Sequence, residues 1–132
     1  MATRRLDDLI IWQIARELAA DIYRHTLDEA FDRDPHLRAE LRRSACAIMA
    51  NIAVGYEADT AGLLARGFSR AAQAAAELSS LVQLTIDLDV LGRPVVAGML
   101  VRVSEISRLI RGWQRALRTQ RLVKRLATTR IN

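Results

Sequence analysis

The chain has 132 residues, of which 51% are hydrophobic, with a single cysteine and a formal net charge of +5 at pH 7. This length suffices for one domain with a hydrophobic core, and one cysteine excludes an internal disulfide. No apolar run reaches transmembrane length, and Asp7 and Asp8 lie where a signal peptide needs its apolar segment. We therefore expect a single cytoplasmic domain without a membrane partner.

Two helices are predicted in the first part of the chain. The first covers residues 6–26, where four apolar residues recur at helical spacing: Ile11, Ile14, Leu18 and Ile22. After a polar connection, Asp34 and Pro35 provide a cap and a first-turn residue for a second helix over residues 36–56.

The second predicted helix is rich in small residues, so neighbouring helices can approach it closely on several sides. Asn51 interrupts its apolar run. If the amide is buried it needs hydrogen-bond partners and could fix the register of a bundle; alternatively, it bonds to the backbone and helps to end the helix near Gly55. We expect Arg42 and Arg43 to form ion pairs within or between subunits rather than a basic patch. Candidate partners are Glu40, Asp87 and Asp89.

Two longer helices are predicted in the rest of the chain. One covers residues 61–91 and carries a seven-residue apolar repeat, which favours bundle packing at shallow crossing angles. Asp59 or Thr60 is expected to cap it, and Gly92 followed by Pro94 marks its end. The last helix covers residues 94–125 and is followed by a frayed basic tail, residues 126–132. The pattern as a whole predicts an all-α bundle.

Charge is divided unevenly along the chain. Residues 1–92 contain 10 Lys and Arg against 14 Asp and Glu, whereas residues 93–132 contain 10 Lys and Arg against the lone Glu105. Such a division sets the electric field of the surface rather than the fold, so it bears on the choice of partner.

The excess positive charge forms one face of the last helix, opposite its apolar stripe, and extends over roughly 25 Å. Five arginines belong to it, Arg108, Arg111, Arg115, Arg118 and Arg125, and Arg121 and Lys124 flank them as further candidates for binding. An ordinary solvated helix mixes charges of both signs, so this face predicts binding to phosphates of RNA or DNA. The alternatives are a solvated face of an arginine-rich protein and, less favoured, a membrane-surface helix. No aromatic residue interleaves with the cations, because Trp113 points inward, so base stacking is not expected.

Enzyme chemistry finds no support in the sequence. Neither His25 nor His36 follows a glutamate by three residues, which excludes the di-iron pattern, and one cysteine without a histidine pair excludes a zinc site. There is no glycine-rich phosphate loop. We therefore expect no catalytic residue, metal or cofactor. Trp12 and Trp113 are expected to be core or interface anchors, and exposure of Trp12 on one side would suit a subunit contact.

Several motifs in this order resemble one bacterial family: Trp12-Gln13, Leu41-Arg42-Arg43-Ser44-Ala45, Ala50-Asn51-Ile52-Ala53-x-Gly55 and Phe68-x-x-Ala71-x-x-x-Ala75-x-Glu77-Leu78. The family is that of the bacterial four-helix bundle proteins, which includes the 23S rRNA intervening-sequence proteins and the accessory variability determinant proteins of diversity-generating retroelements. The resemblance covers residues 9–91. The family usually has glutamate where this chain has Val54, so no role is carried over to that position.

The resemblance implies an antiparallel up-down-up-down four-helix bundle that assembles as a homopentamer, binds nucleic acid and works beside a reverse transcriptase. Together with the charge division, it predicts a non-enzymatic accessory protein of a retroelement reverse transcriptase. The alternative is a structural protein–protein interaction module without a nucleic-acid role.

Overall fold

The computed structural model describes residues 5–131, apart from the side chains of residues 121–124 and 127–131. Every regular element in this range is helical. Two short 3-10 turns, η1 (Leu6–Asp8) and η2 (Glu29–Arg33), accompany four α-helices: α1 (Ile10–His25), α2 (Pro35–Tyr56), α3 (Ala61–Asp87) and α4 (Arg93–Ile131). The all-α prediction is confirmed.

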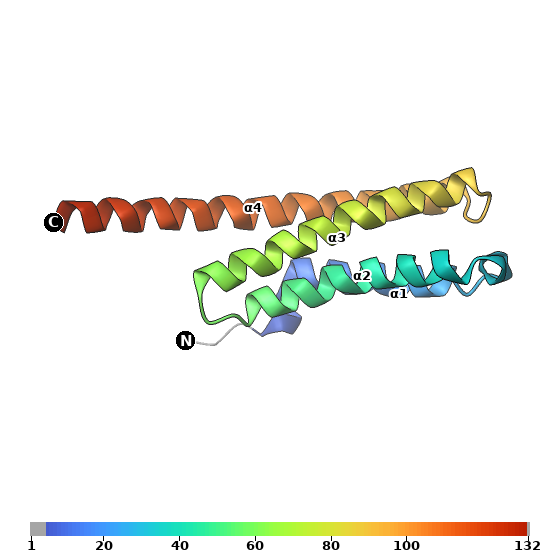
Figure 1. Ribbon diagram of the computed structural model, residues 1–132, viewed down its shortest axis with the longest axis horizontal. Coiled ribbons are helices and arrows are strands. Elements are labelled where there is room, and N and C mark those ends of the chain that lie inside the picture. The colour runs from blue at the N-terminus through green and yellow to red at the C-terminus, as the bar shows by residue number, and fades with distance from the viewer. Residues whose placement is uncertain (1–4, 132) are drawn as a thin grey trace.

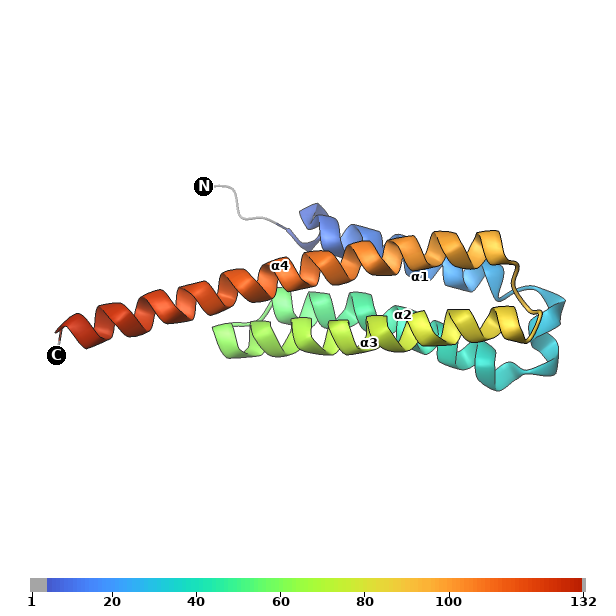
Figure 2. The same ribbon diagram turned by 90° about the horizontal axis from the view of Figure 1, so that it is seen from above.

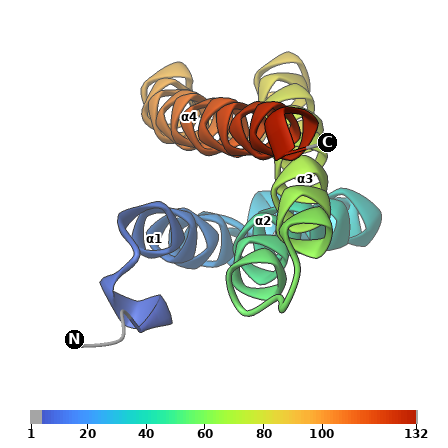
Figure 3. The ribbon, with the colours of Figure 1, turned by 90° about the vertical axis from the view of Figure 1, so that its left-hand side faces the viewer.

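The four α-helices form an antiparallel bundle. Figures 1 and 2 show the α1–α2 and α3–α4 connections at one end of the molecule and the α2–α3 connection toward the other. Seen end-on in Figure 3, α1 and α2 form one layer and α3 and α4 lie over it. α4 continues well past the start of α3, so its C-terminal part projects from the bundle (Figure 1).

The core takes side chains from every α-helix. Phe31, in η2, is fully buried and closes the core at the end where α1 joins α2. The other largest fully buried side chains include Ile11, Leu18, Ile22, Leu41, Ile48, Ile52, Phe68, Leu78, Val82, Ile106 and Ile110. Each contributes about 1.5 to 3 kcal/mol relative to an exposed position, so the bundle is held mainly by this apolar interior.

α2 and α3 approach most closely where Gly55 faces Gly67. A Cβ atom added to Gly67 would lie 2.5 Å from the Cα of Gly55 and 2.8 Å from the carbonyl oxygen of Asn51. Neither glycine has a positive φ. The contact therefore requires glycine for close packing and not for backbone freedom, and Gly55 serves to admit α3 rather than to stop α2.

The expected helix caps are present. The Asp34 carboxylate accepts a hydrogen bond from the N–H of Leu37 at 3.0 Å, with Pro35 in the first turn of α2. For α3, Thr60 rather than Asp59 is the cap, and its hydroxyl accepts from the N–H of Leu63 at 3.2 Å. These side chains satisfy N–H groups that have no partner within the helix.

The predicted first helix is divided in the structure. η1 is a separate turn, Leu9 is extended (φ −82°, ψ 109°) and α1 begins at Ile10. The break follows from Asp8, whose carboxylate accepts a hydrogen bond from the N–H of Arg5 at 3.3 Å and closes the turn locally. The prediction of one helix from residue 6 is therefore wrong at its start.

α3 ends at Asp87, four residues before the predicted end. Asp89 adopts a left-handed conformation (φ 56°), and the N–H of Val90 donates to the carbonyl of Thr85 at 2.9 Å. This pattern is a Schellman end with aspartate in the position that glycine usually takes. The prediction placed the end at Gly92 because it assigned the left-handed residue to the glycine.

α4 continues to Ile131, so the prediction of a frayed tail is wrong for residues 126–131. Residues 113–131 contain neither glycine nor proline and are dominated by Arg, Leu and other strong helix formers. This intrinsic helix propensity keeps α4 helical beyond the point where other helices pack against it. Asn132, the last residue of the predicted tail, lies outside the described residues.

Candidate nucleic-acid interface

Four arginines of α4 lie on the side of the helix that faces away from the core. Arg108, Arg111, Arg115 and Arg118 are all exposed, while Val103, Ile106, Ile110 and Leu117 on the opposite side are buried. The arginines are three or four residues apart, so they recur on one side of the helix over about 15 Å. The structure therefore brings these four predicted residues together.

None of the four has a carboxylate partner within the part of the chain that the structure describes. Among their guanidinium groups, the one hydrogen bond to described residues is a long contact of 3.5 Å from Arg118 Nε to the carbonyl oxygen of Gln114. Glu105, the lone acid of α4, pairs with none of them. A cationic face without internal counter-charges attracts external anions.

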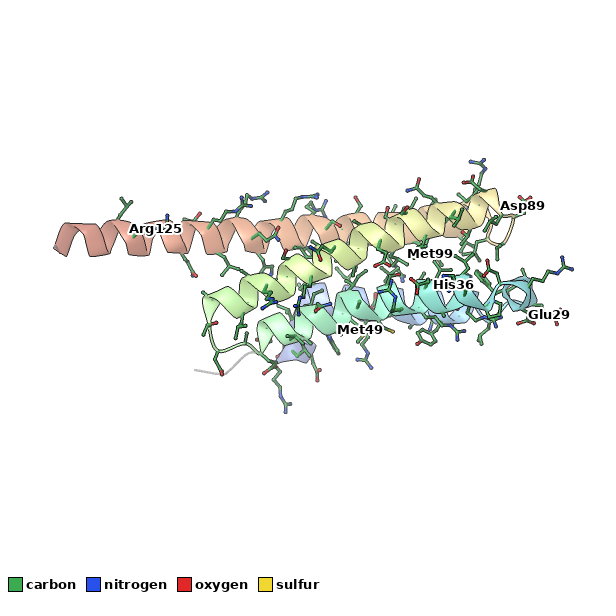
Figure 4. All side chains as sticks on the ribbon, viewed as in Figure 1. Glu29, His36, Met49, Asp89, Met99 and Arg125 are labelled. Atoms are coloured by element: carbon green, nitrogen blue, oxygen red, sulfur yellow. The ribbon has the colours of Figure 1, made fainter. Side chains whose placement is uncertain are left out.

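The remaining three predicted cations lie further along α4. Arg125 is exposed and sits on the part of the helix that projects from the bundle (Figure 4). The side chains of Arg121 and Lys124 lie outside the described residues.

The arginine pair of α2 has a different environment. Arg43 forms ion pairs with Glu40, at 2.9 Å, and with Glu77 of α3. The hydrogen bond from Arg43 lowers the pKa of Glu40, and the bonds to Glu40 and Glu77 raise the pKa of Arg43. The prediction of Glu40 as a partner is confirmed. Glu77 was missed because no local pattern signals a contact 34 residues away.

Arg42 has no carboxylate partner among the described residues, so it forms no ion pair within the chain, and an ion pair between subunits stays a prediction. Its Nε donates to the hydroxyl of Thr26 at 2.9 Å, and its guanidinium lies 4.5 Å from the centre of the Tyr23 ring. Thr26 is fully buried and donates in turn to the carbonyl of Ile22 at 2.7 Å. Arg38, which the sequence did not single out, donates to the carbonyl of Thr26 at 2.8 Å. These arginines join the end of α1 to α2.

Asp87 and Asp89, the other two candidate partners, form no ion pair with Arg42 or Arg43. Both aspartates are exposed near the end of α3. Arg43 contacts α3 at Glu77, about three turns before these aspartates, which leaves both of them out of its reach.

The other predicted structural residues lie in or beside the core. Asn51 is half-buried and donates from Nδ2 to the carbonyl of Ala47 at 2.8 Å, one turn back in its own helix, so it does not cap the end of α2. Trp113 stacks on Phe68 with the ring centres 5.2 Å apart, as an inward anchor. Trp12 is half-buried, with the guanidinium of Arg16 5.4 Å from its ring.

The lone cysteine lies at the α1–α2 contact and not in the core. Cys46 is half-buried, and its Sγ lies 3.8 Å from the hydroxyl of Tyr23. This hydrogen bond raises the pKa of Tyr23. The small apolar neighbours of Cys46 in the sequence predict a thiol in the core, and that prediction is wrong.

The end of the bundle opposite the α4 projection is acidic. Figure 4 shows Glu29 and Asp89 at this end and Arg125 at the other. A groove of about 680 Å³ there is lined by residues of η2 and of the α3–α4 connection, among them Glu29, Asp32, Asp34 and Asp89. Four carboxylates against Arg33 thus make the groove at this end net negative, whereas the charged residues described on α4 from Arg108 onward are all arginines.

Across the described side chains, no three His, Cys, Asp or Glu residues converge to hold a metal ion. In the same part of the chain, no helix is both long and apolar enough to cross a bilayer.

Known proteins support the fold. The family model for the "23S rRNA-intervening sequence protein" matches residues 7–112. A crystal structure of a protein of unknown function, from the S23 ribosomal protein family of Bacteroides thetaiotaomicron, superposes with a TM-score of 0.70. The two sequences are 20% identical, and the match covers 76% of this chain and 94% of that one. At this identity the likeness concerns the fold alone, and it confirms the four-helix bundle. No curated protein matches the chain significantly.

Proposed function

The chain belongs to the 23S rRNA-intervening sequence protein family, and on that premise we propose that it is a non-enzymatic accessory protein that binds RNA or DNA phosphates through α4. The observation that carries the proposal is the exposed row of Arg108, Arg111, Arg115 and Arg118, which has no carboxylate partner among the described residues. The family match ends at residue 112. For Arg115 and Arg118 the proposal therefore rests on charge and exposure.

The chemistry of these side chains suits phosphate. A guanidinium presents several donors in a fixed plane and binds phosphate oxygens in a bidentate manner. Successive phosphates along a strand can meet successive arginines of a straight helix. Because such contacts go to the backbone, we expect weak sequence preference.

The charge distribution also orients the complex. The acidic end, with Glu29 and Asp89, repels phosphates, whereas α4 and its projection attract them. The nucleic acid therefore lies toward the α4 side, and the acidic end remains available for a protein partner.

The proposal also covers the oligomeric state of the protein and the enzyme that it serves. We propose a homopentamer that serves a retroelement reverse transcriptase by holding nucleic acid near it. A ring would multiply the field of the α4 arginines. Light scattering on the purified protein measures the oligomer mass, and co-purification with a reverse transcriptase encoded beside it tests the partnership.

The decisive experiment for the function compares two variants of equal charge. One replaces Arg108, Arg111, Arg115 and Arg118 with glutamine; the control replaces four other exposed arginines, Arg33, Arg66, Arg70 and Arg93. Binding to a labelled oligouridylate and an oligothymidylate, each of about 20 nucleotides, is followed by fluorescence anisotropy. We expect the α4 variant to lose at least about tenfold in affinity and the control to lose less than about threefold.

Equal loss in both variants would mean that only net charge matters and would refute a role for α4. Absence of binding by the wild-type protein at low salt would refute the nucleic-acid function altogether.

A protein-docking module is the second candidate, and one observation favours it. Val54 and Leu63 are 61% and 51% exposed and line the same groove between α2 and α3. Exposed aliphatic side chains in a groove are typical of protein contacts. Protein docking would be favoured over nucleic-acid binding if the wild-type protein binds no nucleic acid while keeping its oligomeric state.

A further inference from the structure

The four arginines of α4 divide into two rows. Arg111 and Arg118 line grooves between α3 and α4, whereas Arg108 and Arg115 line neither of these grooves. Each row has a spacing of seven residues, or two turns, and the rows are about 60° apart around the helix. The sequence presented these residues as a single face, but the position of α3 separates them.

The two grooves are successive stretches of one seam, called here the α3–α4 seam. The stretch of about 500 Å³ includes Arg111 and that of about 260 Å³ includes Arg118. Because the helices are antiparallel, residues that rise along α4 face residues that descend along α3. The seam extends from Gln83 and Leu100 to Ala65 and Arg118, about 27 Å at 1.5 Å per residue.

The lining of the seam suits an anionic chain. Hydroxyl and amide groups from both helices border it: Ser69, Ser79 and Gln83 from α3, and Ser104, Ser107 and Gln114 from α4. Alanines such as Ala72 and Ala76 leave room along its floor. Among the described residues, no acidic residue lines either stretch. By contrast, the α2–α3 groove includes Glu57 and Asp59 beside Arg66 and Arg70, and the groove at the acidic end includes four carboxylates beside Arg33.

The dimensions favour one strand over two. Axes of packed helices are about 8 to 10 Å apart, so a seam between them is narrower than a duplex, whose major groove alone is about 12 Å wide. In a duplex, phosphates follow each other at about 3.4 Å along each strand, so the seam accommodates several phosphates even when a strand is stretched.

We propose that the α3–α4 seam is the track of a single-stranded RNA or DNA backbone. Arg111 and Arg118 bind its phosphates, and the serine and glutamine side chains donate hydrogen bonds to phosphate and sugar oxygens. Trp113 packs against Phe68, and no aromatic residue among those described lines the seam. Bases are therefore not stacked, and binding has little sequence preference. This inference rests on the proposed function and specifies its ligand and its residues.

Two matched pairs on the same helix test the inference. R111Q/R118Q removes the seam arginines, and R108Q/R115Q removes two equally spaced arginines outside it. The probes are a labelled oligouridylate of about 20 nucleotides and an RNA duplex of the same length. We expect the seam pair to weaken single-strand binding at least about tenfold and the other pair less than about threefold. The duplex should bind more weakly than the single strand.

A second comparison adds charge without removing any arginine. S104E places a carboxylate in the seam, and V101E places one on an exposed position of α4 outside it, since Val101 is 67% exposed and lines neither stretch. We expect S104E alone to weaken single-strand binding. Circular dichroism melting confirms that both variants fold.

The outcomes separate this inference from the proposed function. Equal loss of affinity in both arginine pairs, or tighter binding of the duplex than of the single strand, would contradict the seam as the binding site. Neither result would contradict nucleic-acid binding by α4. If the wild-type protein binds neither probe, both the seam and the proposed nucleic-acid function are refuted.

Discussion

α2 and α4 both carry several arginines, but the arginines of the two helices have different partners. On α2, Arg38, Arg42 and Arg43 are engaged by a threonine, by the backbone of the α1–α2 corner and by glutamates of α2 and α3. On α4, the four arginines from Arg108 to Arg118 meet no carboxylate within the described part of the chain.

This difference shows that the residues around an arginine determine whether it stabilises the fold or stays available for binding. α2 is packed between α1 and α3, so its cations have internal partners and hold the bundle together. On α4, Arg102 pairs with Asp21 of α1, but the four arginines from Arg108 to Arg118 face solvent, where their partner must come from outside. Changes on α2 should therefore affect stability, and changes on α4 should affect binding.

The largest effect on stability is expected where α2 touches α3. Gly67→Ala places a Cβ 2.5 Å from the Cα of Gly55, so the helices must separate, and we expect a loss of about 2 to 3 kcal/mol in the free energy of unfolding. Gly62→Ala is the control in the same helix. A Cβ there meets nothing within 4 Å, and alanine should be neutral or stabilise by up to about 1 kcal/mol.

Urea unfolding measures both variants. Equal stability of the two would contradict the close contact between α2 and α3.

A smaller effect is expected for Arg42. Arg42→Ala removes the donor to the Thr26 hydroxyl and the contact with the Tyr23 ring, and it should cost about 1 to 2 kcal/mol in unfolding free energy while leaving nucleic-acid affinity unchanged. Arg111→Ala should do the reverse, with stability within about 0.5 kcal/mol of wild type and weaker binding, because Arg111 is exposed and lines the α3–α4 seam. Weaker binding in Arg42→Ala, with Arg111→Ala unaffected, would contradict the comparison of the two helices.

The smallest effect is expected for the exposed ion pairs of Arg43. Glu77→Gln should lower the melting temperature slightly in low salt and not at all in high salt, because solvent and ions screen such pairs. The lowered pKa of Glu40 gives the sign with pH. Its contribution is complete above the ordinary pKa of glutamate and is lost as pH falls through its folded-state value. A large shift that persists in high salt would contradict this description.

Much of the fold was predictable from local chemistry. Apolar spacing located the four helices, and Asp34 and Thr60 cap α2 and α3 as side chains of their type do. The errors arose where an uncommon residue type ended a helix and where nothing in the sequence interrupted one. Asp89 took the left-handed position that the sequence assigned to Gly92, and α4 stayed helical without neighbours.

The site was predictable only in part. Spacing alone placed Arg108, Arg111, Arg115 and Arg118 on one side of a helix. It could not separate the two rows, because that depends on which side of α4 faces α3. Contacts such as Arg43 with Glu77 depend on the register between helices, which no local pattern encodes.

The most direct test of the central claim is the salt dependence of binding to oligouridylate. We compare the wild-type protein with the variant in which Arg108, Arg111, Arg115 and Arg118 are glutamine. Two to four phosphate contacts, at about 0.7 per contact on a single strand, predict that the slope of log affinity against log salt becomes shallower by about 1.5 to 3 in the variant. Parallel slopes for the two proteins would contradict phosphate binding by α4.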